Sequence, residues 1–330
     1  MTGAAGFIGS VLAAHLAGAG WMVSAVDVLD RDERWRNLAG VPLANYWDAS
    51  ELLPALAGGT VTPPPDAIVH LGACSSTTET NAGFLMRNNF ACTRDLAMWA
   101  LEHGVRFVYA SSAATYGAGE LGYADDLEIL PHLRPMNRYA VSKHLMDLWA
   151  LEHGAFRGPG AITGLKYFNV YGPNEQHKGS MRSMVLKAFE QIQSSGKVGL
   201  FRSYKAEFAD GMQERDFLYV EDAAAMTAWF LDHPEATGIY NVGSGSKHSW
   251  NDLAHATFRA LGREPAIEYI AMPAELRAAY QYSTCANLTR LRAAGCALPV
   301  TSLEEGVGRY VREFLLAGRG FTPASAVRDC

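Results

Sequence analysis

The sequence predicts an α/β fold, a doubly wound parallel sheet with a smaller α/β lobe. Three observations support this. A glycine-rich turn opens the chain, short apolar runs then alternate with helical stretches to about residue 175, and beyond that point strands become sparse and loops longer. Alternating strands and helices are joined by right-handed crossovers, which produce a doubly wound sheet.

The strands are expected in apolar runs that show no alternation of polar residues. Continuous apolarity indicates strands covered on both faces, as in a parallel sheet. Helices are expected where longer amphipathic stretches end in Gly, which often follows a helix C-terminus. The predicted strands are residues 21–27, 67–73, 105–112 and 161–170. The predicted helices include residues 10–17, 84–104 and 137–154.

The chain is expected to form two closely packed lobes, because it contains no internal repeat and no low-complexity linker. Residues 1–170 should form the first lobe, and residues 215–245 should return to it. Residues 171–330 should form most of the smaller lobe, which includes an irregular stretch at 201–216.

Composition is that of a globular protein, with 49% apolar and 19% charged residues. No apolar run approaches the length needed to cross a bilayer, and we expect no signal peptide. The cysteines, Cys74, Cys92, Cys285, Cys296 and Cys330, lack CxxC spacing and are odd in number. This argues against a disulfide framework or a metal site and for the reducing cytoplasm. The formal net charge of −6 argues against a nucleic-acid partner.

The opening stretch MTGAAGFIGS predicts a turn that receives the pyrophosphate of a dinucleotide. Gly3, Gly6 and Gly9 are spaced by threes, and a helix follows whose first N–H groups can face a phosphate. Glycine spacing alone is weak support for such a site. Asp27 adds to it, because it closes the next strand 18 residues after Gly9, where an acidic residue meets the adenine ribose.

Three arginines, Arg31, Arg34 and Arg36, follow Asp27 and could instead hold a 2′-phosphate on that ribose. A solvated loop is the alternative for each of them. Spacing therefore predicts the dinucleotide site and leaves the form of the dinucleotide open.

The strand that normally precedes such a turn is short, since only Met1 and Thr2 come before Gly3. That strand lies centrally in a doubly wound sheet, and each lost apolar residue forfeits roughly 1.5–3 kcal/mol of burial. We therefore expect the natural start to lie a few codons upstream, or the chain to have been trimmed.

A second group of residues carries chemistry. Ser112 ends a buried strand, at the edge of a parallel sheet where ligands bind. Tyr139 follows 27 residues later, and Lys143 lies one helical turn beyond it on the same face. The ammonium group can lower the pKa of the phenol, which is about 10 in water. Tyr139 can then take a proton from an alcohol that Ser112 orients, while hydride leaves for a nicotinamide.

These residues, in this order, resemble the extended short-chain dehydrogenase/reductase superfamily, which has a Rossmann fold. The resemblance runs essentially end to end. The stretches GACSSTTE (72–79), YASSAATYG (109–117), YFNVYGPNEQHKGSM (167–181), RDFLYV (215–220) and LTRLRAAG (288–295) narrow it. They look like the family of ADP-L-glycero-D-manno-heptose 6-epimerases, nucleotide-sugar epimerases that act in lipopolysaccharide precursor synthesis.

The resemblance implies epimerisation at C6″ of an ADP-heptose by transient hydride transfer to a bound cofactor, NADP with NAD as the alternative. It implies Tyr139 and Lys178 as the two acid/base residues, completed by Ser112 and Lys143. It also implies a homopentamer. The implied cofactor contacts are Gly3, Gly6, Phe7, Ile8, Gly9, Asp27, Arg34, Leu71, Gly72, Ala73, Cys74, Ser75, Asn88, Lys143, Val170 and Lys178. The implied substrate contacts are Asn169, Ser180, Lys187, Phe201, Arg202, Ser203, Tyr204, Arg215 and Tyr280.

Independently of the resemblance, cations gather in the second lobe of this acidic chain, which suits a diphosphate. They are Lys178, Arg182, Lys187, Arg202, Lys205 and Arg215. His177 is expected to be a supporting loop residue, and Cys74 a small buried thiol.

The chain departs from the family pattern at three further places. Val28 stands where a polar residue usually follows the ribose acid, and Ala49 where a lysine often grips the 2′-phosphate. Position 187 carries Lys in place of His. The first two departures weaken the preference for NADP over NAD.

Three other functions are alternatives for this sequence. A 4,6-dehydratase needs an Asp-Glu pair just after the strand-end serine, where this chain has Ala113, Ala114 and Thr115. A UDP-sugar 4-epimerase shares Ser112, Tyr139 and Lys143 but does not explain Lys178. A non-catalytic dinucleotide sensor would need the glycine turn without the Tyr/Lys pair.

Overall fold

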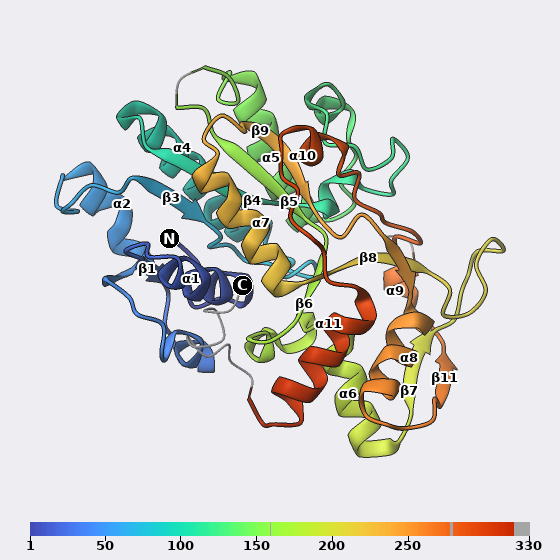
Figure 1. Ribbon diagram of the computed structural model, residues 1–330. Coiled ribbons are helices and arrows are strands. Elements are labelled where there is room, and N and C mark those ends of the chain that lie inside the picture. Colours follow the sequence, from blue (N-terminus) through green and yellow to red (C-terminus); the bar gives the residue numbers. More distant parts are fainter. Residues whose placement is uncertain (159, 278–279, 320–330) are drawn as a thin grey trace.

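The computed structural model describes residues 1–158, 160–277 and 280–319, and its first lobe is built on a parallel sheet (Figure 1). Two of its strands pair with each other and four others form the larger part, in the order β3-β4-β5-β9. The strands are β1 (Ser24–Asp27), β2 (Asn45–Asp48), β3 (Ala67–His70), β4 (Arg106–Ser112), β5 (Thr163–Tyr167) and β9 (Gly238–Val242). Every pairing within the sheet is parallel, so the doubly wound α/β prediction is confirmed.

The two parts of the sheet are joined by the first residues of the chain. Thr2 bridges to Val26 of β1 on one side and to His70 of β3 on the other. The Met1 carbonyl accepts from the Val26 N–H at 2.8 Å, and the Thr2 N–H donates to the Val69 carbonyl at 2.9 Å. The short first strand therefore lies at the centre of the sheet, as the sequence predicted.

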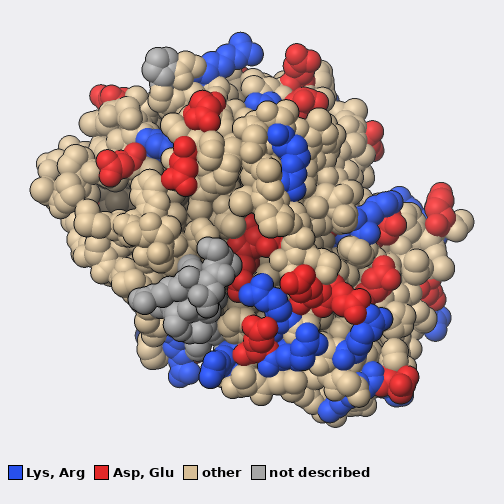
Figure 2. Space-filling view, in the orientation of Figure 1, with Lys and Arg blue, Asp and Glu red and all other residues tan. Residues whose placement is uncertain are grey.

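A cavity, here called the slot, lies between β1 and β3 next to Met1 and Thr2. Its volume is about 600 Å³, and its apolar lining includes Val23, Ile68 and Val69. Figure 2 shows the surface hollowed on this side of the molecule. Because Thr2 alone bridges the two strands among the described residues, this slot separates β1 from β3 along the rest of their length.

Helices cover both faces of the sheet (Figure 1). One face carries α1 (Phe7–Gly18) and α7 (Val220–Asp232), which pack against each other. The other face carries α2 (Ala49–Ala57), α3 (Ala82–Leu85), α4 (Cys92–His103) and α5 (Arg138–Glu152). In β4, Phe107 and Tyr109 join the core on one side while Val108 joins the core on the other. This double burial explains why the strands lack alternating polar residues.

The second lobe combines two small sheets with a group of helices. One sheet has the order β10-β8-β6, and the other pairs β11 with β7. The strands are β6 (Asn169–Tyr171), β7 (Val198–Phe201), β8 (Glu214–Tyr219), β10 (Lys247–Ser249) and β11 (Ile267–Ile270). The helices are α6 (Met184–Ser195), α8 (Trp250–Ala260), α9 (Ala274–Arg277) and α11 (Leu303–Arg309). Helix α10 (Thr289–Ala293) packs against β9 of the first lobe. Within residues 215–245, α7 and β9 accompany the first lobe while β8 belongs to the second.

Short turns complete the chain between these elements. The 3-10 turns are Glu33–Leu38, Ala113–Tyr116, Leu127–His132 and Gln176–Met181. The π turns are Met86–Ala91, between α3 and α4, and Tyr310–Leu315, after α11.

Two predicted elements differ from the structure. The predicted strand 161–170 is two strands, because the Phe168 N–H makes the last bond to β9, at Val242, and the chain then leaves to pair with β8. The predicted helix 84–104 is not continuous, because the π turn at 86–91 interrupts the regular α-helix around Asn89. Such turns concentrate at functional sites.

The composition predicted free cysteines and no membrane-spanning segment, and the structure bears on both. Cys74, Cys92, Cys285 and Cys296 are free thiols, and Cys330 lies outside the described residues. Among residues 1–158, 160–277 and 280–319, no helix is both long and apolar enough to span a membrane.

His70 of β3 makes folding stability depend on pH. It is 3% exposed and lies between the hydroxyls of Thr2, at 2.6 Å from Nδ1, and Thr93, at 2.9 Å from Nε2. Burial, reinforced by the charge of Lys143, lowers its pKa to about 3. The unfolded chain binds this proton below its ordinary pKa of about 6.5, so stability is lost as pH falls from there towards 3.

We therefore expect His70→Gln to flatten this dependence. Between pH 7 and pH 4 the His70 contribution amounts to about 3 kcal/mol, so the variant should lose that much less stability than the parent chain. Urea unfolding at both pH values measures the difference. Equal losses in the two proteins would contradict the assignment, whatever the variant's stability at pH 7.

Candidate active site

A cavity of about 580 Å³ opens at the carboxyl ends of the main-sheet strands. This is the edge at which open parallel sheets bind ligands. Residues from the glycine turn, the loop after β3, the end of β4, α5, and the segments around 170 and 178 line it. The predicted site residues that it brings together are Gly3, Gly6, Phe7, Ile8, Gly9, Asp27, Arg34, Leu71, Gly72, Ala73, Cys74, Ser75, Ser112, Tyr139, Lys143, Asn169, Val170 and Lys178.

The glycine turn presents the N-terminus of α1 to this cavity. Gly3 has a φ of +66°, and the Gly6 N–H donates back to the Gly3 carbonyl at 3.0 Å. Gly6 is the N-cap of α1 and has no side chain to cap the first N–H groups of the helix. Uncapped N–H groups at the positive end of a helix dipole bind phosphate. The turn therefore fits the pyrophosphate of a dinucleotide.

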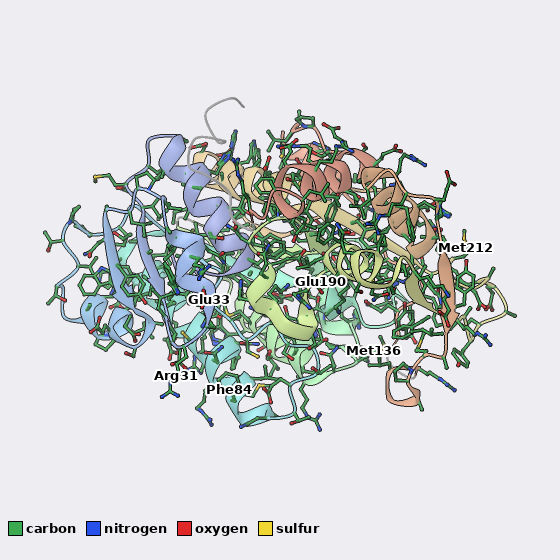
Figure 3. The ribbon with its side chains drawn as sticks, turned by 90° about the horizontal axis from the view of Figure 1, so that it is seen from below. Arg31, Glu33, Phe84, Met136, Glu190 and Met212 are labelled. Carbon is green, nitrogen blue, oxygen red and sulfur yellow. The ribbon has the colours of Figure 1, made fainter. Side chains whose placement is uncertain are left out.

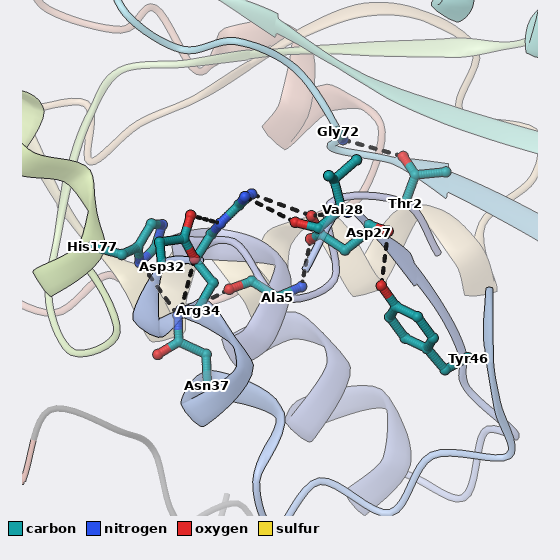
Figure 4. A network of polar contacts seen from close by, with 10 residues as sticks. All are labelled: Thr2, Ala5, Asp27, Val28, Asp32, Arg34, Asn37, Tyr46, Gly72 and His177. Atoms are coloured by element: carbon teal, nitrogen blue, oxygen red, sulfur yellow. Dashed lines mark hydrogen bonds and ion pairs between the residues drawn. The ribbon is translucent and has the colours of Figure 1, made fainter. Parts of the chain in front are cut away.

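Asp27 ties the glycine turn to the neighbouring loop (Figure 4). Its carboxylate accepts from the N–H of Ala5 at 2.7 Å and from that of Val28 at 2.8 Å, and Arg34 Nη1 lies 3.3 Å from it. Arg34 is held further by Asp32, at 2.7 Å from Nε, and by the Val28 carbonyl, at 2.9 Å from Nη2. These contacts fix the guanidinium beside Asp27, at the end of the cavity where the sequence predicts the adenine ribose.

The other two candidate arginines do not join this end. Arg31 is exposed and points away from the ribbon (Figure 3), and Arg36 pairs with Glu33 outside the cavity lining. Of the three, only Arg34 lines the cavity.

The end of β4 and helix α5 bring Ser112, Tyr139 and Lys143 together. Asn137 caps α5 by accepting from the Ala140 N–H at 2.8 Å, and this starts the helix so that Tyr139 and Lys143 share one face. The Lys143 ammonium donates to the Ala110 carbonyl at 2.8 Å. Burial raises the pKa of Tyr139, and its hydrogen bond with Ser112 opposes that rise. Burial lowers the pKa of Lys143 to about 8, against the opposing charge of Asp147.

Lys178 reaches the cavity from the 3-10 turn at 176–181. Its Nζ lies 5.0 Å from the centre of the Phe7 ring, so the second lobe contacts the glycine turn directly. Burial lowers the pKa of Lys178, while the nearby Glu175 carboxylate raises it. A lysine with a depressed pKa can exchange a proton near neutral pH.

His177 lies in the 176–181 turn and contacts the loop that follows β1. Its Nδ1 lies 3.4 Å from the Asn37 amide, which also donates to the carbonyls of Ala5 and Asn174 (Figure 4). Burial lowers the pKa of His177 to about 4, so the ring is neutral at physiological pH. Its contacts are those of a supporting residue.

Asn89, which the sequence did not single out, holds the Cys74 loop. Its side chain accepts from the Cys74 N–H at 2.9 Å and donates to the Cys74 carbonyl and the Ser142 hydroxyl, both at 3.0 Å. The predicted contact Asn88 is not among the lining residues, and its amide donates to Asn89. The π turn at 86–91 determines that position 89, and not position 88, faces the Cys74 loop. The spacing of residues in the sequence does not reveal this turn.

The remaining predicted substrate contacts are outside the cavity lining. Lys187 donates to the Ser180 carbonyl at 2.6 Å, beside the turn that carries Lys178. Phe201, Arg202, Ser203 and Tyr204 follow β7, and the Tyr204 N–H donates to the Tyr282 hydroxyl at 3.1 Å. Their role as substrate contacts therefore stays a prediction.

Arg215, in the second lobe, is a buried cation that packs against two aromatic rings. It is 7% exposed, and its guanidinium carbon lies 5.0 Å from the Tyr280 ring centre and 5.5 Å from that of Trp250. The Trp250 indole donates to the Tyr280 hydroxyl at 2.9 Å, which fixes the two rings. Elsewhere on the second lobe, Figure 2 shows basic side chains interspersed with acidic ones.

Several lining residues were missed by the sequence analysis: Asp32, Ser76, Thr77, Met181, Gln281 and Thr284. Gln281 reaches across from the second lobe to donate to the Gly117 carbonyl at 2.5 Å. A contact between positions this far apart in sequence leaves no local pattern. Asp32 could have been predicted from the sequence, because an acidic residue two positions before Arg34 is a candidate ion-pair partner for it.

Known proteins resemble this chain in both sequence and structure. Residues 1–243 match the model of the NAD dependent epimerase/dehydratase family. An ADP-L-glycero-D-manno-heptose-6-epimerase of Nitratidesulfovibrio vulgaris is 47% identical, covering 97% of this chain and 99% of its own. One of Fusobacterium nucleatum is 42% identical, covering 96% and 97%.

Two solved structures agree with these relatives. The Helicobacter pylori ADP-L-glycero-D-manno-heptose-6-epimerase superposes with a TM-score of 0.78 at 27% identity, covering 95% of this chain and 94% of its own. The Thermus thermophilus UDP-glucose 4-epimerase in complex with NAD has a TM-score of 0.74 at 26% identity, covering 94% and 96%.

Proposed function

The chain belongs to the NAD dependent epimerase/dehydratase family and, within it, to the ADP-L-glycero-D-manno-heptose-6-epimerases; from this we propose that it interconverts ADP-D-glycero-D-manno-heptose and ADP-L-glycero-D-manno-heptose. The reaction inverts C6″ of the heptose and supplies a lipopolysaccharide precursor. A nicotinamide cofactor, bound along the glycine turn, supplies a reversible acceptor for the C6″ hydride.

In this proposal Tyr139 and Lys178 are the two acid/base residues. Tyr139 exchanges a proton with the C6″ oxygen in one orientation of the keto intermediate, and Lys178 does so in the other. Ser112 hydrogen-bonds that oxygen, and Lys143 holds the nicotinamide ribose. One observation carries the assignment: Tyr139 on α5 and Lys178 on the 176–181 turn line the same cavity. A second base in that place distinguishes this reaction from 4-epimerisation.

The experiment that tests the function incubates the purified chain with ADP-D-glycero-D-manno-heptose and no added cofactor. Proton NMR follows the C6″ signals, and conversion to a mixture of both epimers is expected. No conversion after adding NADP and then NAD would overturn the proposal. Conversion of UDP-glucose to UDP-galactose in its place would favour a UDP-sugar 4-epimerase, and cofactor binding without any turnover would favour a sensor.

We propose NADP as the cofactor and Arg34 as the residue that binds its 2′-phosphate. Arg34 is held beside Asp27 and Asp32, and its side chain is 24% exposed, so it has room for a further acceptor. The same two carboxylates would repel a phosphate, and Val28 and Ala49 supply no further cation. The preference therefore depends on this one side chain.

We expect Arg34→Ala to weaken NADP binding about 10- to 100-fold and to change NAD binding by less than about threefold, because a charged hydrogen bond contributes roughly 1.5–3 kcal/mol. Isothermal titration calorimetry with each dinucleotide measures this. Arg31→Ala is the matched control and should change neither affinity. If Arg34→Ala weakens both dinucleotides equally, Arg34 acts on the turn and not on the phosphate.

The oligomeric state and location are further parts of the proposal. We propose a homopentamer on the ground of the family resemblance, and a cytoplasmic location on the ground of the composition and the odd number of cysteines without CxxC spacing. Sedimentation equilibrium of the purified chain should give five times the 35.8 kDa chain mass. A monomer or a dimer would contradict the pentamer and leave the proposed reaction intact.

A further inference from the structure

A buried ion pair lies beneath the catalytic residues and outside the cavity lining. It joins Asp147 of α5 to Lys166 of β5, with Lys166 Nζ 2.6 Å from the Asp147 carboxylate. Both side chains are 0% exposed. No role in binding or proton transfer has been given to either residue.

Asp147 fastens helix α5 to strand β4. Its carboxylate accepts from the Tyr109 hydroxyl and from the Ser111 hydroxyl, both at 2.8 Å. One helical turn earlier, Lys143 donates to the carbonyl of Ala110. Three consecutive β4 residues, 109–111, are thus bound to the face of α5 that carries Tyr139, and Ser112 follows at once.

Lys166 acts on the other side, on the residues after Ser112. Its ammonium donates to the Thr115 hydroxyl at 2.6 Å and lies 5.1 Å from the centre of the Tyr116 ring. The Thr115 hydroxyl in turn donates to the Ser112 carbonyl at 2.8 Å. A chain of contacts therefore leads from Asp147 through Lys166 and Thr115 to the backbone of Ser112.

We propose that Asp147 and Lys166 are positioning residues that fix Ser112 relative to Tyr139 and Lys143. The proposal rests on the proposed function, because it concerns the same catalytic group. Stability alone is a weak reason for such a pair, since apolar residues of similar volume often stabilise a core equally well or better. Placement of reacting groups is demanding in comparison, since an error of about 1 Å can cost a hundredfold in rate.

Asp147 also acts on Lys143 through its charge. The carboxylate raises the pKa of Lys143 against the effect of burial. The other titratable groups around Lys143 are Cys74, Cys92 and His70, from the loop after β3, the start of α4, and β3. Among these groups, Asp147 makes the largest contribution that raises the pKa of Lys143.

The test replaces the pair by neutral side chains of similar size, Asp147→Asn with Lys166→Met. We expect this double variant to fold and to bind NADP within about threefold of the parent. Its kcat should fall about 10- to 100-fold with little change in KM. The alkaline limb of its kcat–pH profile should move to lower pH, because Asp147 raises the pKa of Lys143 and this contribution is lost.

Two further variants separate position from charge. Thr115→Val keeps the ion pair and breaks the link to Ser112, so kcat should fall about tenfold without movement of the alkaline limb. Glu221→Gln with Arg309→Met removes a partly exposed ion pair, 2.8 Å apart and outside the cavity lining, and should leave kcat unchanged. Parental kcat and pH profile in a folded Asp147→Asn/Lys166→Met protein would overturn the proposal, as would parental kcat in Thr115→Val if the double variant does not fold.

Failure of the proposed function would be recognised separately. If the parent chain epimerises no sugar, the function fails, and the positioning role is then measured on Tyr139 itself. Ultraviolet titration of its phenolate, as the difference from the same protein carrying Tyr139→Phe, should show a higher pKa in the double variant. An unchanged phenolate pKa in that protein would contradict the role of the pair.

Discussion

Replacing Tyr139 by Phe is expected to lower kcat for C6″ epimerisation by about 10²- to 10⁴-fold, the usual contribution of a positioned acid/base group. The hydroxyl is the only group lost, and the ring keeps its buried position. KM should change little, because the hydroxyl acts on the reacting oxygen and not on the nucleotide. NMR of the epimer mixture over time measures the rate.

Lys178→Met should produce a loss of the same size, because in the proposed mechanism each residue serves one orientation of the intermediate and neither replaces the other. The Tyr139→Phe/Lys178→Met protein should therefore be little slower than either single variant. Tyr269→Phe, whose hydroxyl contacts Asn251 in the second lobe, is a matched control and should retain the parental rate. Parental activity in Lys178→Met would remove the second base from the proposal.

The second large effect is expected from Gly9→Ala. A Cβ at Gly9 would lie 2.0 Å from the Gly3 carbonyl oxygen, and this neighbour is backbone that cannot rotate away. The turn has to open to relieve a strain of about 1–3 kcal/mol, and it then loses its fit to the pyrophosphate. We expect the dinucleotide to bind about 10- to 100-fold more weakly and the melting temperature to fall.

Gly83→Ala is the matched control for this prediction. A Cβ there, inside α3, would meet the end of the flexible Arg87 side chain at 3.4 Å and the Asn81 side-chain oxygen at 3.6 Å, which is an ordinary contact. Alanine in a helix is favoured over glycine by about 0.5–1 kcal/mol, so the control should be neutral or stabilising. Calorimetric titration and thermal melts compare the two proteins. Unchanged dinucleotide affinity in Gly9→Ala would show that the close approach is not needed for binding.

The sequence predicted the parts of the site whose spacing is set by local geometry. Gly3, Gly6 and Gly9 share one turn, and Tyr139 and Lys143 share one helix face because they are four residues apart. Ser112 and Asp27 could be placed because strands of a parallel sheet end at one edge. All of these residues line the cavity.

What the sequence left out depends on contacts between distant segments. Gln281 reaches Gly117, Asn37 reaches Asn174, and Lys166 pairs with Asp147, and none of these contacts follows a helical or strand period. The π turn around Asn89 was not predicted, because its one extra residue does not visibly change the spacing of apolar residues in the sequence. Arg31 and Arg36 matched Arg34 in type, and only the folded loop separated them.

The slot between β1 and β3 has a consequence for how the molecule opens. Across that line β1 is joined to the rest of the sheet only through Met1, Thr2 and the turn that follows, among the described residues. Segments with few bonds to their surroundings open as cooperative units at a lower free energy than the whole protein. The β1–β2 pair with its Arg34 loop is therefore the unit expected to detach first. Hydrogen exchange should be faster there than in β4 and β5, and in that opened state the adenosine end would be lost while Ser112 and Tyr139 stay in place.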